Sequence, residues 1–256
     1  MSRRLEGIGV VVTRPRSAAE PLARELEAEG ARVHIFPALA LEDIEPSAAT
    51  REALEKLPHA SMAIFVSANA AEKGLALVQR LAAWPARTRV AAIGEATAAA
   101  LRHSGFQAVI SPAERHDSEA LLALPELQRV RGETILIFRG EGGREHLRET
   151  LEARGANVLY AECYRRVRPA SDPREVLGAL SGGHVQAVSV LSAETLENFM
   201  ALLGSGGAQA VRGATLVVPH ESIARHAAAS HFARVVVAGH GARGMIEALS
   251  PIQVPE

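Results

Sequence analysis

The sequence repeats itself at an offset of 125 residues, and this duplication is the strongest constraint on its fold. Residues 12–14 correspond to residues 137–139, and the small and apolar residues that follow each segment match in register. The same offset places residues 67–68 onto residues 192–193. A chain of 256 residues is long enough for two domains. The repeat therefore predicts two similar lobes, with a ligand site expected between them.

Each copy alternates strand-like runs with segments of helical periodicity. The predicted strands are residues 7–13, 32–36, 63–66, 89–93, 108–110, 134–138, 157–161, 186–191, 215–218 and 234–237, with extended stretches at 37–43 and 162–168. Capping patterns at Ser17/Glu20 and Asn69/Glu72 predict where two helices begin, and further helices are predicted at 50–56, 95–103, 144–153, 194–203, 222–229 and 243–249. Strands that alternate with helices predict α/β lobes with parallel sheets and helices on both faces.

The composition argues against several functional classes. A net charge of −1 and an aromatic content of 4% argue against a nucleic-acid partner. No apolar run approaches the roughly 18 residues that a membrane span needs, and the N-terminal residues do not resemble a secretory signal. Cys163 is the only cysteine, so an internal disulfide is excluded, and no histidine or cysteine spacing typical of a metal site occurs. We therefore expect a cytoplasmic enzyme or small-molecule binder.

Gly239, Gly241 and Gly244 have the spacing of a dinucleotide-binding fingerprint and lie between a predicted strand and a predicted helix. Only 12 residues follow Gly244. These are too few for the next strand and for the acidic residue that binds the ribose of the cofactor. An ordinary glycine-rich turn is therefore favoured over a dinucleotide site.

Four predicted strands are each followed by a helix, and the turns between them offer free backbone N–H groups. The turns comprise residues 67–69, 94–97, 192–195 and 219–222. The carboxyl ends of parallel strands form the usual ligand-binding edge of an open α/β sheet, and helix N-termini there bind anions without a metal. At each turn, ordinary helix capping is the alternative. Four turns in equivalent places favour a ligand with several carboxylates.

A series of short motifs resembles the uroporphyrinogen-III synthase family. The motifs are residues 12–15, 65–70, 92–98, 105–106, 137–140, 164–165 and 190–193, and their order and spacing extend over nearly the whole chain. The resemblance implies two α/β domains joined by a two-stranded linker. The first domain would consist of residues 1–37 and 168–256, and the second of residues 42–162.

The resemblance also implies a lyase of porphyrin and heme biosynthesis. Members of this family convert the linear tetrapyrrole hydroxymethylbilane into uroporphyrinogen III, with inversion of ring D and loss of water, and they need no cofactor or metal. We therefore expect the reaction to take place in the cleft between the two domains. We also expect a monomer with no nucleic-acid or membrane partner.

The resemblance assigns roles to individual residues. Tyr164 becomes the candidate general acid for departure of the substrate hydroxyl, and the alternative is a hydrogen-bonded tyrosine at a hinge. The candidate substrate-binding residues are Arg14, Ser67, Ala68, Asn69, Gly94, Thr97, Arg139, Gly140, Ser192, Ala193, His220 and Ser222. Arg14 and Arg139 either bind propionates or pair with carboxylates of the protein.

The chain departs from the family pattern in one place. The first copy contains Gly94 and Thr97, and many family members have a similar pattern in the second copy, but here the second copy has His220 and Ile223. Ser222 can replace the missing hydroxyl, whereas Ile223 cannot. The rival hypothesis is a non-catalytic two-lobed binding protein for an anionic small molecule, since duplicated α/β lobes serve binding as readily as catalysis.

Overall fold

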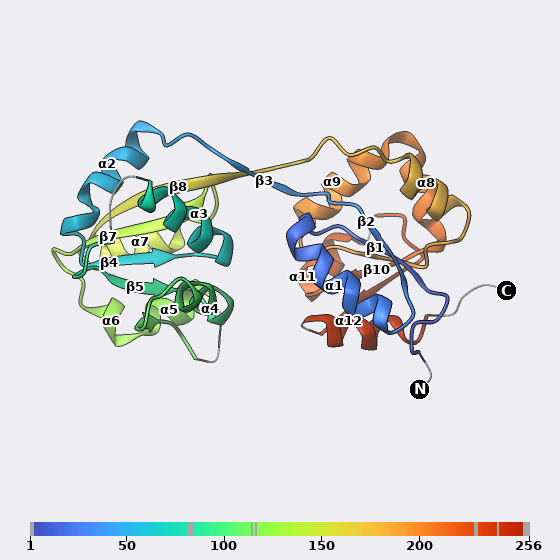
Figure 1. Ribbon diagram of the computed structural model, residues 1–256, viewed down its shortest axis with the longest axis horizontal. Coiled ribbons are helices and arrows are strands. Elements are labelled where there is room, and N and C mark those ends of the chain that lie inside the picture. The colour runs from blue at the N-terminus through green and yellow to red at the C-terminus, as the bar shows by residue number, and fades with distance from the viewer. Residues whose placement is uncertain are drawn as a thin grey trace. The chain divides into compact units, whose positions relative to one another are not determined.

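The computed structural model describes residues 3–80, 84–113, 115, 117–227, 230–239 and 241–252 (Figure 1). The chain divides into two compact units, called unit 1 and unit 2 below. Unit 1 consists of Met1–Ala40 and Val167–Glu256, and unit 2 consists of Leu41–Arg166. Each unit contains a sheet of its own with helices packed against it. The predicted fold class, two similar α/β lobes of which one is discontinuous in sequence, is therefore confirmed.

Unit 1 is built on a parallel sheet of order β11-β10-β9-β1-β2. Its strands are β1 (Gly9–Val12), β2 (Arg32–Ile35), β9 (Ala187–Ser189), β10 (Thr215–Val218) and β11 (Arg234–Val237), and its α-helices are α1 (Arg16–Ala28), α8 (Arg174–Ser181), α9 (Ala193–Leu203), α10 (Gly207–Ala210), α11 (Glu221–His226) and α12 (Gly241–Leu249). Val10 and Val12 pack in one apolar cluster with α1 and α12, whereas Val11 packs in another with α8, α9 and α11. Helices thus cover both faces of the sheet, which explains the uninterrupted apolar sequence of β1.

Unit 2 is built on a sheet of order β3-β8-β7-β4-β5-β6, in which β4 to β8 pair in parallel. Its strands are β3 (Ala40–Asp43), β4 (Met62–Phe65), β5 (Arg89–Ala92), β6 (Val109–Ile110), β7 (Thr134–Gly140) and β8 (Asn157–Val167), and its α-helices are α2 (Ala48–Lys56), α3 (Ala68–Gln79), α4 (Glu95–His103), α5 (Ser118–Ala123), α6 (Pro125–Gln128) and α7 (His146–Ala153). Phe65 and Phe138 lie in the cluster with α2 to α4, and their rings stack with centroids 4.6 Å apart. Ile64 and Ile137 lie in the cluster with α5 to α7. Alternate residues of neighbouring strands therefore form the two cores of this unit.

The two sheets have equivalent strand orders. The order β6-β5-β4-β7-β8 in unit 2 repeats the order β11-β10-β9-β1-β2 in unit 1. Strands β1 and β2 belong to the first copy of the repeat, but they pair into one sheet with the last three strands of the second copy. The chain passes from unit 1 to unit 2 in β3 and returns at the end of β8, and these two strands are neighbours in the sheet. They form the two-stranded linker.

The predicted capping pair Ser17/Glu20 is wrong. The carbonyl of Pro15 accepts hydrogen bonds from the backbone N–H groups of Ala18 and Ala19, both at 2.9 Å. The helix α1 therefore begins before Ser17, at Arg16. No side chain of a described residue forms a capping hydrogen bond with this helix.

The predicted capping pair Asn69/Glu72 is also wrong, because both residues lie inside α3. The helix is capped by Ser67, whose hydroxyl accepts a hydrogen bond from Ala70 N at 3.0 Å. Ser67 follows β4 almost directly, so the helix begins as soon as the strand ends. The capping role that the sequence allowed for Ser67 is confirmed.

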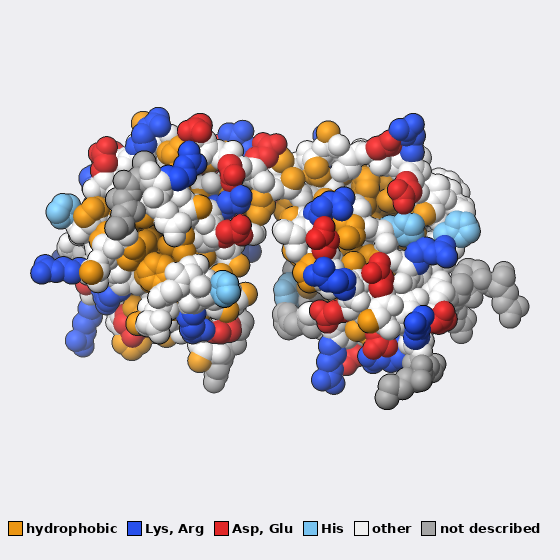
Figure 2. Space-filling model, viewed as in Figure 1, with side chains coloured by type: hydrophobic (Ala, Val, Ile, Leu, Met, Phe, Trp, Pro, Cys, Tyr) orange, Lys and Arg blue, Asp and Glu red, His pale blue; other side chains and the backbone are white. Residues whose placement is uncertain are grey.

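Two other kinds of difference from the prediction are a longer strand and several short helices that were not predicted. Residues 157–167 form the single strand β8 instead of a strand and a separate extended stretch. The helices α5, α6, α8 and α10 were not predicted, because with 6, 4, 8 and 4 residues they are shorter than the window of about 11 residues in which helical periodicity is recognised. Among the described residues, no helix combines the length and the apolar character that crossing a membrane requires. Basic and acidic side chains are interspersed on the visible face of each unit (Figure 2), in keeping with the net charge of −1.

Candidate functional site

Unit 2 contains a cavity of about 370 Å³ beside the carboxyl ends of β4, β5 and β7. This is the edge at which open α/β sheets usually bind ligands. Four of the predicted site residues line the cavity: Ser67, Arg139, Gly140 and Tyr164. They come from β7, β8 and the start of α3, and the fold brings them together from three separate stretches of sequence.

Tyr164 forms part of the cavity wall, and only 6% of it is exposed. The pairing of β7 with β8 is irregular after Arg139, and this irregularity places Tyr164 opposite Gly140. A Cβ atom on Gly140 would lie 2.6 Å from the tyrosine ring, so this position requires glycine. The Tyr164 hydroxyl lies 3.2 Å from Ser67 Oγ, and either oxygen can be the donor. Because Ser67 Oγ also caps α3, the phenol is anchored at the start of a helix.

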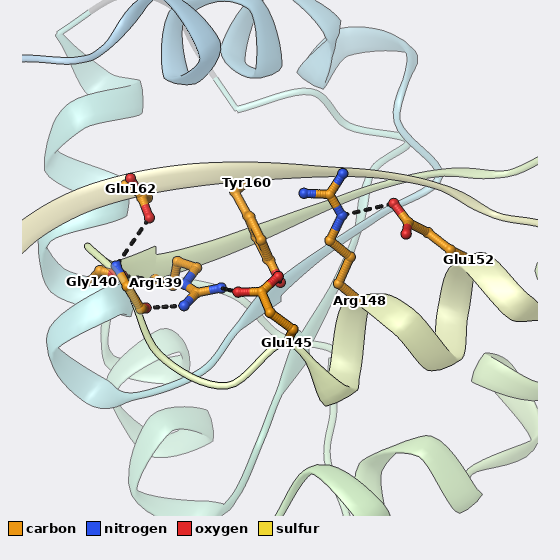
Figure 3. Close-up of polar contacts among 8 residues, drawn as sticks. Arg139, Gly140, Glu145, Arg148, Glu152, Tyr160 and Glu162 are labelled. Atoms are coloured by element: carbon orange, nitrogen blue, oxygen red, sulfur yellow. Dashed lines mark hydrogen bonds and ion pairs between the residues drawn. The ribbon is translucent and has the colours of Figure 1, made fainter.

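Arg139 is buried beside the same cavity (Figure 3). Its Nη1 donates to Glu145 Oε1 at 3.0 Å, its Nε donates to the carbonyl of Gly140 at 3.3 Å, and its Nη2 donates to the carbonyl of Gly142. The guanidinium carbon lies 4.3 Å from the ring centroid of Tyr160, a cation–π distance. Of the two roles open to Arg139 from the sequence, the structure shows pairing with a carboxylate of the protein.

Tyr160 and Glu145 complete this network. The Tyr160 hydroxyl donates to Glu145 Oε2 at 2.8 Å (Figure 3). Burial, reinforced by this hydrogen bond, raises the pKa of Tyr160 to about 12. The same hydrogen bond, together with the contact from Arg139, lowers the pKa of Glu145 below its ordinary value. At neutral pH the phenol is therefore a neutral donor, and Glu145 is an ionised acceptor.

Arg14 of unit 1 has the opposite environment. Its Nε is buried, and within the described part of the chain no hydrogen-bond partner is found for this atom. Burial lowers the pKa of the guanidinium. Arg14 lines a smaller cavity of about 100 Å³, whose wall also includes Ser189, a buried residue whose Oγ likewise has no partner among the described residues.

The remaining predicted residues occupy helix starts. Ser192 caps α9, where its Oγ accepts from Thr195 N at 3.1 Å, and Ala193 is the first residue of that helix. Gly94 precedes α4, with Thr97 buried in its first turn, and neither lines the unit 2 cavity. The residues Ala68 and Asn69 are exposed in the first turn of α3, His220 precedes α11, and Ser222 is exposed inside it.

Ile223, the position at which the chain departs from the family pattern, is packed in the apolar core of unit 1 and is 9% exposed. It therefore contributes to packing at this place. The glycine-rich segment from Gly239 to Gly244 also has a packing explanation. A Cβ atom on Gly244 would lie 2.2 Å from the backbone of Gly239, so the start of α12 requires a glycine there. This supports the ordinary glycine-rich turn, although residue 240 lies outside the described residues.

The sequence prediction missed the turn between β7 and α7, residues 141–145. This turn contributes Gly142, Gly143 and Arg144 to the cavity wall. Gly142 and Gly143 have φ angles of 70° and 109°, a region that favours glycine. The available signal was a pair of glycines and an arginine directly after a predicted strand. Among the described residues, no group of three or more histidine, cysteine or acidic side chains is arranged to hold a metal ion.

Comparisons with known proteins agree on one family. The family model described as uroporphyrinogen-III synthase HemD matches residues 20–247. The uroporphyrinogen-III synthase of Salmonella typhimurium is 37% identical over 197 residues, which cover 76% of this chain and 80% of that protein. The enzyme of Escherichia coli is 34% identical over 197 residues, with coverages of 77% and 80%.

Solved structures show the same fold. A mutant uroporphyrinogen III synthase of Thermus thermophilus matches with a TM-score of 0.58 and 19% identity, covering 94% of this chain and 96% of that chain. The uroporphyrinogen-III synthetase of Helicobacter pylori matches with a TM-score of 0.59 and 13% identity, covering 94% and 97%. With these likenesses in fold and the matches in sequence, the chain belongs to the uroporphyrinogen-III synthase family.

Proposed function

We propose that this protein is a uroporphyrinogen-III synthase, a hydro-lyase of heme biosynthesis. It would cyclise hydroxymethylbilane to uroporphyrinogen III with inversion of ring D and loss of water. The observation that carries this proposal is the family match over residues 20–247, together with curated relatives of that name at 34–37% identity over most of the chain.

The unit 2 cavity offers a chemical basis for the first step. Hydroxide is a poor leaving group, so loss of the substrate hydroxyl requires a proton donor. Tyr164 carries a hydroxyl on the wall of a cavity of about 370 Å³, and Ser67 fixes its position. We propose Tyr164 as the general acid for departure of the hydroxyl.

The substrate carries eight acetate and propionate groups, which need many donors. We propose that the helix starts at Ser67–Asn69, Gly94–Thr97, Ser192–Ala193 and His220–Ser222 bind some of these carboxylates, with Arg14 as a further ligand and Gly140 as the wall beside Tyr164. We also propose that the domains are residues 1–37 with 168–256 and residues 42–162, which correspond closely to units 1 and 2. A monomeric state and a cytoplasmic location stay predictions from the sequence.

The decisive experiment measures which isomer forms. Freshly prepared hydroxymethylbilane is incubated with the purified protein, and the products are oxidised to uroporphyrins and separated by chromatography. Type III product supports the enzyme, whereas the type I isomer alone, which forms without a catalyst, supports the rival non-catalytic binding protein. A heat-denatured sample of the same protein gives the uncatalysed background.

A further inference from the structure

The turn formed by residues 141–145 is tied to Arg139 and places Arg144 on the wall of the unit 2 cavity. We propose that Arg139 positions this turn and that Arg144 is the residue that binds a substrate carboxylate in the cavity. The inference rests on the proposed function, because it takes the substrate to be a polycarboxylate. The sequence left two roles open for Arg139, and this inference favours pairing with a carboxylate of the protein over direct contact with the substrate.

Each nitrogen of the Arg139 guanidinium group already forms a hydrogen bond within the protein. Its three nitrogens donate hydrogen bonds to Glu145 and to the carbonyls of Gly140 and Gly142. Only 6% of its side chain is exposed, and the ring of Tyr160 lies against the guanidinium group. Three of its five N–H groups are therefore used within the protein, and the burial of the side chain leaves a substrate carboxylate little access to the other two. Its charge is also already compensated by Glu145, so a further carboxylate gains less there than at an unpaired arginine.

The turn is also fastened to β8, the strand that carries the candidate acid. Glu141 N donates to the carbonyl of Tyr164 at 2.8 Å, and Gly142 N donates to Glu162 Oε1 at 3.2 Å. The carboxylate of Glu141 forms an ion pair with Arg165 of the same strand. Arg139 on one side and β8 on the other therefore hold the turn at a fixed place relative to Tyr164.

Arg144 differs from Arg139 in both exposure and pairing. Its side chain is exposed, and it forms no hydrogen bond or ion pair with any described residue. The carboxylates beside it in the turn have other partners, since Glu141 pairs with Arg165 and Glu145 pairs with Arg139. Its charge is therefore available on the cavity wall. A guanidinium group binds a carboxylate through two parallel hydrogen bonds.

The opposite charge on the cavity wall comes from the start of α5. Asp117 and Glu119 both line the cavity. Asp117 accepts hydrogen bonds from Ala120 N at 2.8 Å and from Arg115 Nη2 at 2.6 Å, which lower the pKa of its carboxyl group and keep it ionised. Because Arg115 compensates the charge of Asp117, the repulsion on this side comes mainly from Glu119, and it favours a substrate carboxylate on the Arg144 side of the cavity.

The test uses Arg144→Gln and Arg144→Lys, with Arg51→Gln as the matched control. Arg51 is an exposed arginine of α2 in the same unit, and it does not line the cavity. We expect Arg144→Gln to raise the KM for hydroxymethylbilane by about tenfold or more with kcat changed less than threefold, since charge-assisted hydrogen bonds of this kind are lost. Arg144→Lys restores part of the affinity, and Arg51→Gln leaves both constants unchanged.

Arg139→Gln and Glu145→Gln test the positioning role. We expect Arg139→Gln to lower kcat by about tenfold, with a smaller change in KM, because the turn shifts against Tyr164. Glu145→Gln keeps the shape of the partner but removes its charge, so its loss of kcat is smaller and in the same direction. It also serves as the second variant if Arg139→Gln does not fold.

The outcomes separate this inference from the proposed function. Type III product from the wild type tests the function alone. If the wild type makes type III product and Arg144→Gln keeps its KM within twofold, the assignment of Arg144 is wrong while the function stands. If Arg139→Gln or Glu145→Gln changes KM as Arg144→Gln does and leaves kcat unchanged, Arg139 binds the substrate directly and the positioning role is wrong.

Discussion

Arg14 in unit 1 and Arg139 in unit 2 occupy equivalent positions of the sequence repeat, but their guanidinium groups have different surroundings. Arg139 donates hydrogen bonds from all three nitrogens and pairs with Glu145. Arg14 has a buried Nε for which the described residues supply no acceptor. Both copies of the repeat thus have arginine at this position, but the segment that follows it decides whether the guanidinium group finds hydrogen-bond acceptors in the same unit.

The difference arises in the five equivalent residues that lie shortly after each arginine, residues 16–20 in unit 1 and residues 141–145 in unit 2. After Arg14, residues 16–20 form the first turns of α1. The equivalent residues 141–145 form an open turn, and α7 begins only at His146. The turn contains Gly142 and Gly143 in left-handed backbone conformations that residues of a regular helix do not adopt. Glycine therefore unwinds the start of the helix in unit 2 and leaves carbonyl groups free to accept from the arginine.

The largest effect is expected from Tyr164, one of the two tyrosines on the cavity wall, neither of which has a tyrosine counterpart in unit 1. Both tyrosines of the chain lie in unit 2, and the residue equivalent to Tyr164 is Leu39. We expect Tyr164→Phe to lower kcat for type III product by roughly 10² or more, as for other general acids. The isomer assay measures this. A turnover within about threefold of the wild type would leave only the role of a hydrogen-bonded tyrosine.

Removing the two equivalent arginines compares the units directly. Arg139→Gln removes the donor to Glu145 Oε1 and to two carbonyls, so we expect the free energy of unfolding to fall by roughly 1–3 kcal/mol. Arg14→Gln removes a guanidinium group that has no carboxylate partner among the described residues, and we expect a change of at most about 0.5 kcal/mol. Urea unfolding followed by circular dichroism measures both. Equal losses would show that Arg14 has a stabilising partner.

Substitutions at the equivalent positions 143 and 18, one in the turn after β7 and one in α1, are expected to change the free energy of unfolding less. Gly143 has a φ of 109°, and a Cβ atom there would lie 2.8 Å from Arg139 Nη2. We expect Gly143→Ala to cost about 1–2 kcal/mol of unfolding free energy through strain. The matched control is Ala18→Gly at the equivalent position in α1, which costs at most about 1 kcal/mol. If Gly143→Ala is as mild as its control, the turn is not held by Arg139.

The repeat predicted the two sheets well because it depends on the spacing of apolar residues along the chain. The motifs also led to Tyr164, Ser67 and Gly140, which prove to share one cavity wall. The two glycines after β7 signal a turn, but the place of that turn beside Tyr164 was missed because it depends on residues far away in sequence. In the register of β7 and β8, Arg139 lies opposite Glu162, and the irregularity that follows sets Tyr164 opposite Gly140. No pattern along one segment contains this register.

The same reason explains why the role of Arg139 stayed open at the level of sequence. Its partner Glu145 follows six residues later, a spacing that brings two side chains together neither on a helix nor on a strand. Only the glycine-containing turn brings the carboxylate back to the guanidinium group. Tyr160, which holds the other carboxylate oxygen, comes from the neighbouring strand.

The smallest expected effect concerns Glu145, the carboxylate partner that Arg139 has and for which Arg14 has no counterpart among the described residues. Hydrogen bonding from Tyr160, with a further contribution from Arg139, lowers the pKa of Glu145 below its ordinary value of 4.5. A carboxyl group whose pKa is lowered in the folded state contributes stability above its unfolded pKa, and this contribution is lost as the pH falls through the folded value. We therefore expect Glu145→Gln to lose less stability than the wild type between neutral pH and pH values below about 4. The effect is small, because the Glu145 side chain is 49% exposed and solvent screens its charge. Unfolding by urea at a series of pH values measures it, and identical slopes for the two proteins would show that the Arg139 network does not depend on an ionised Glu145.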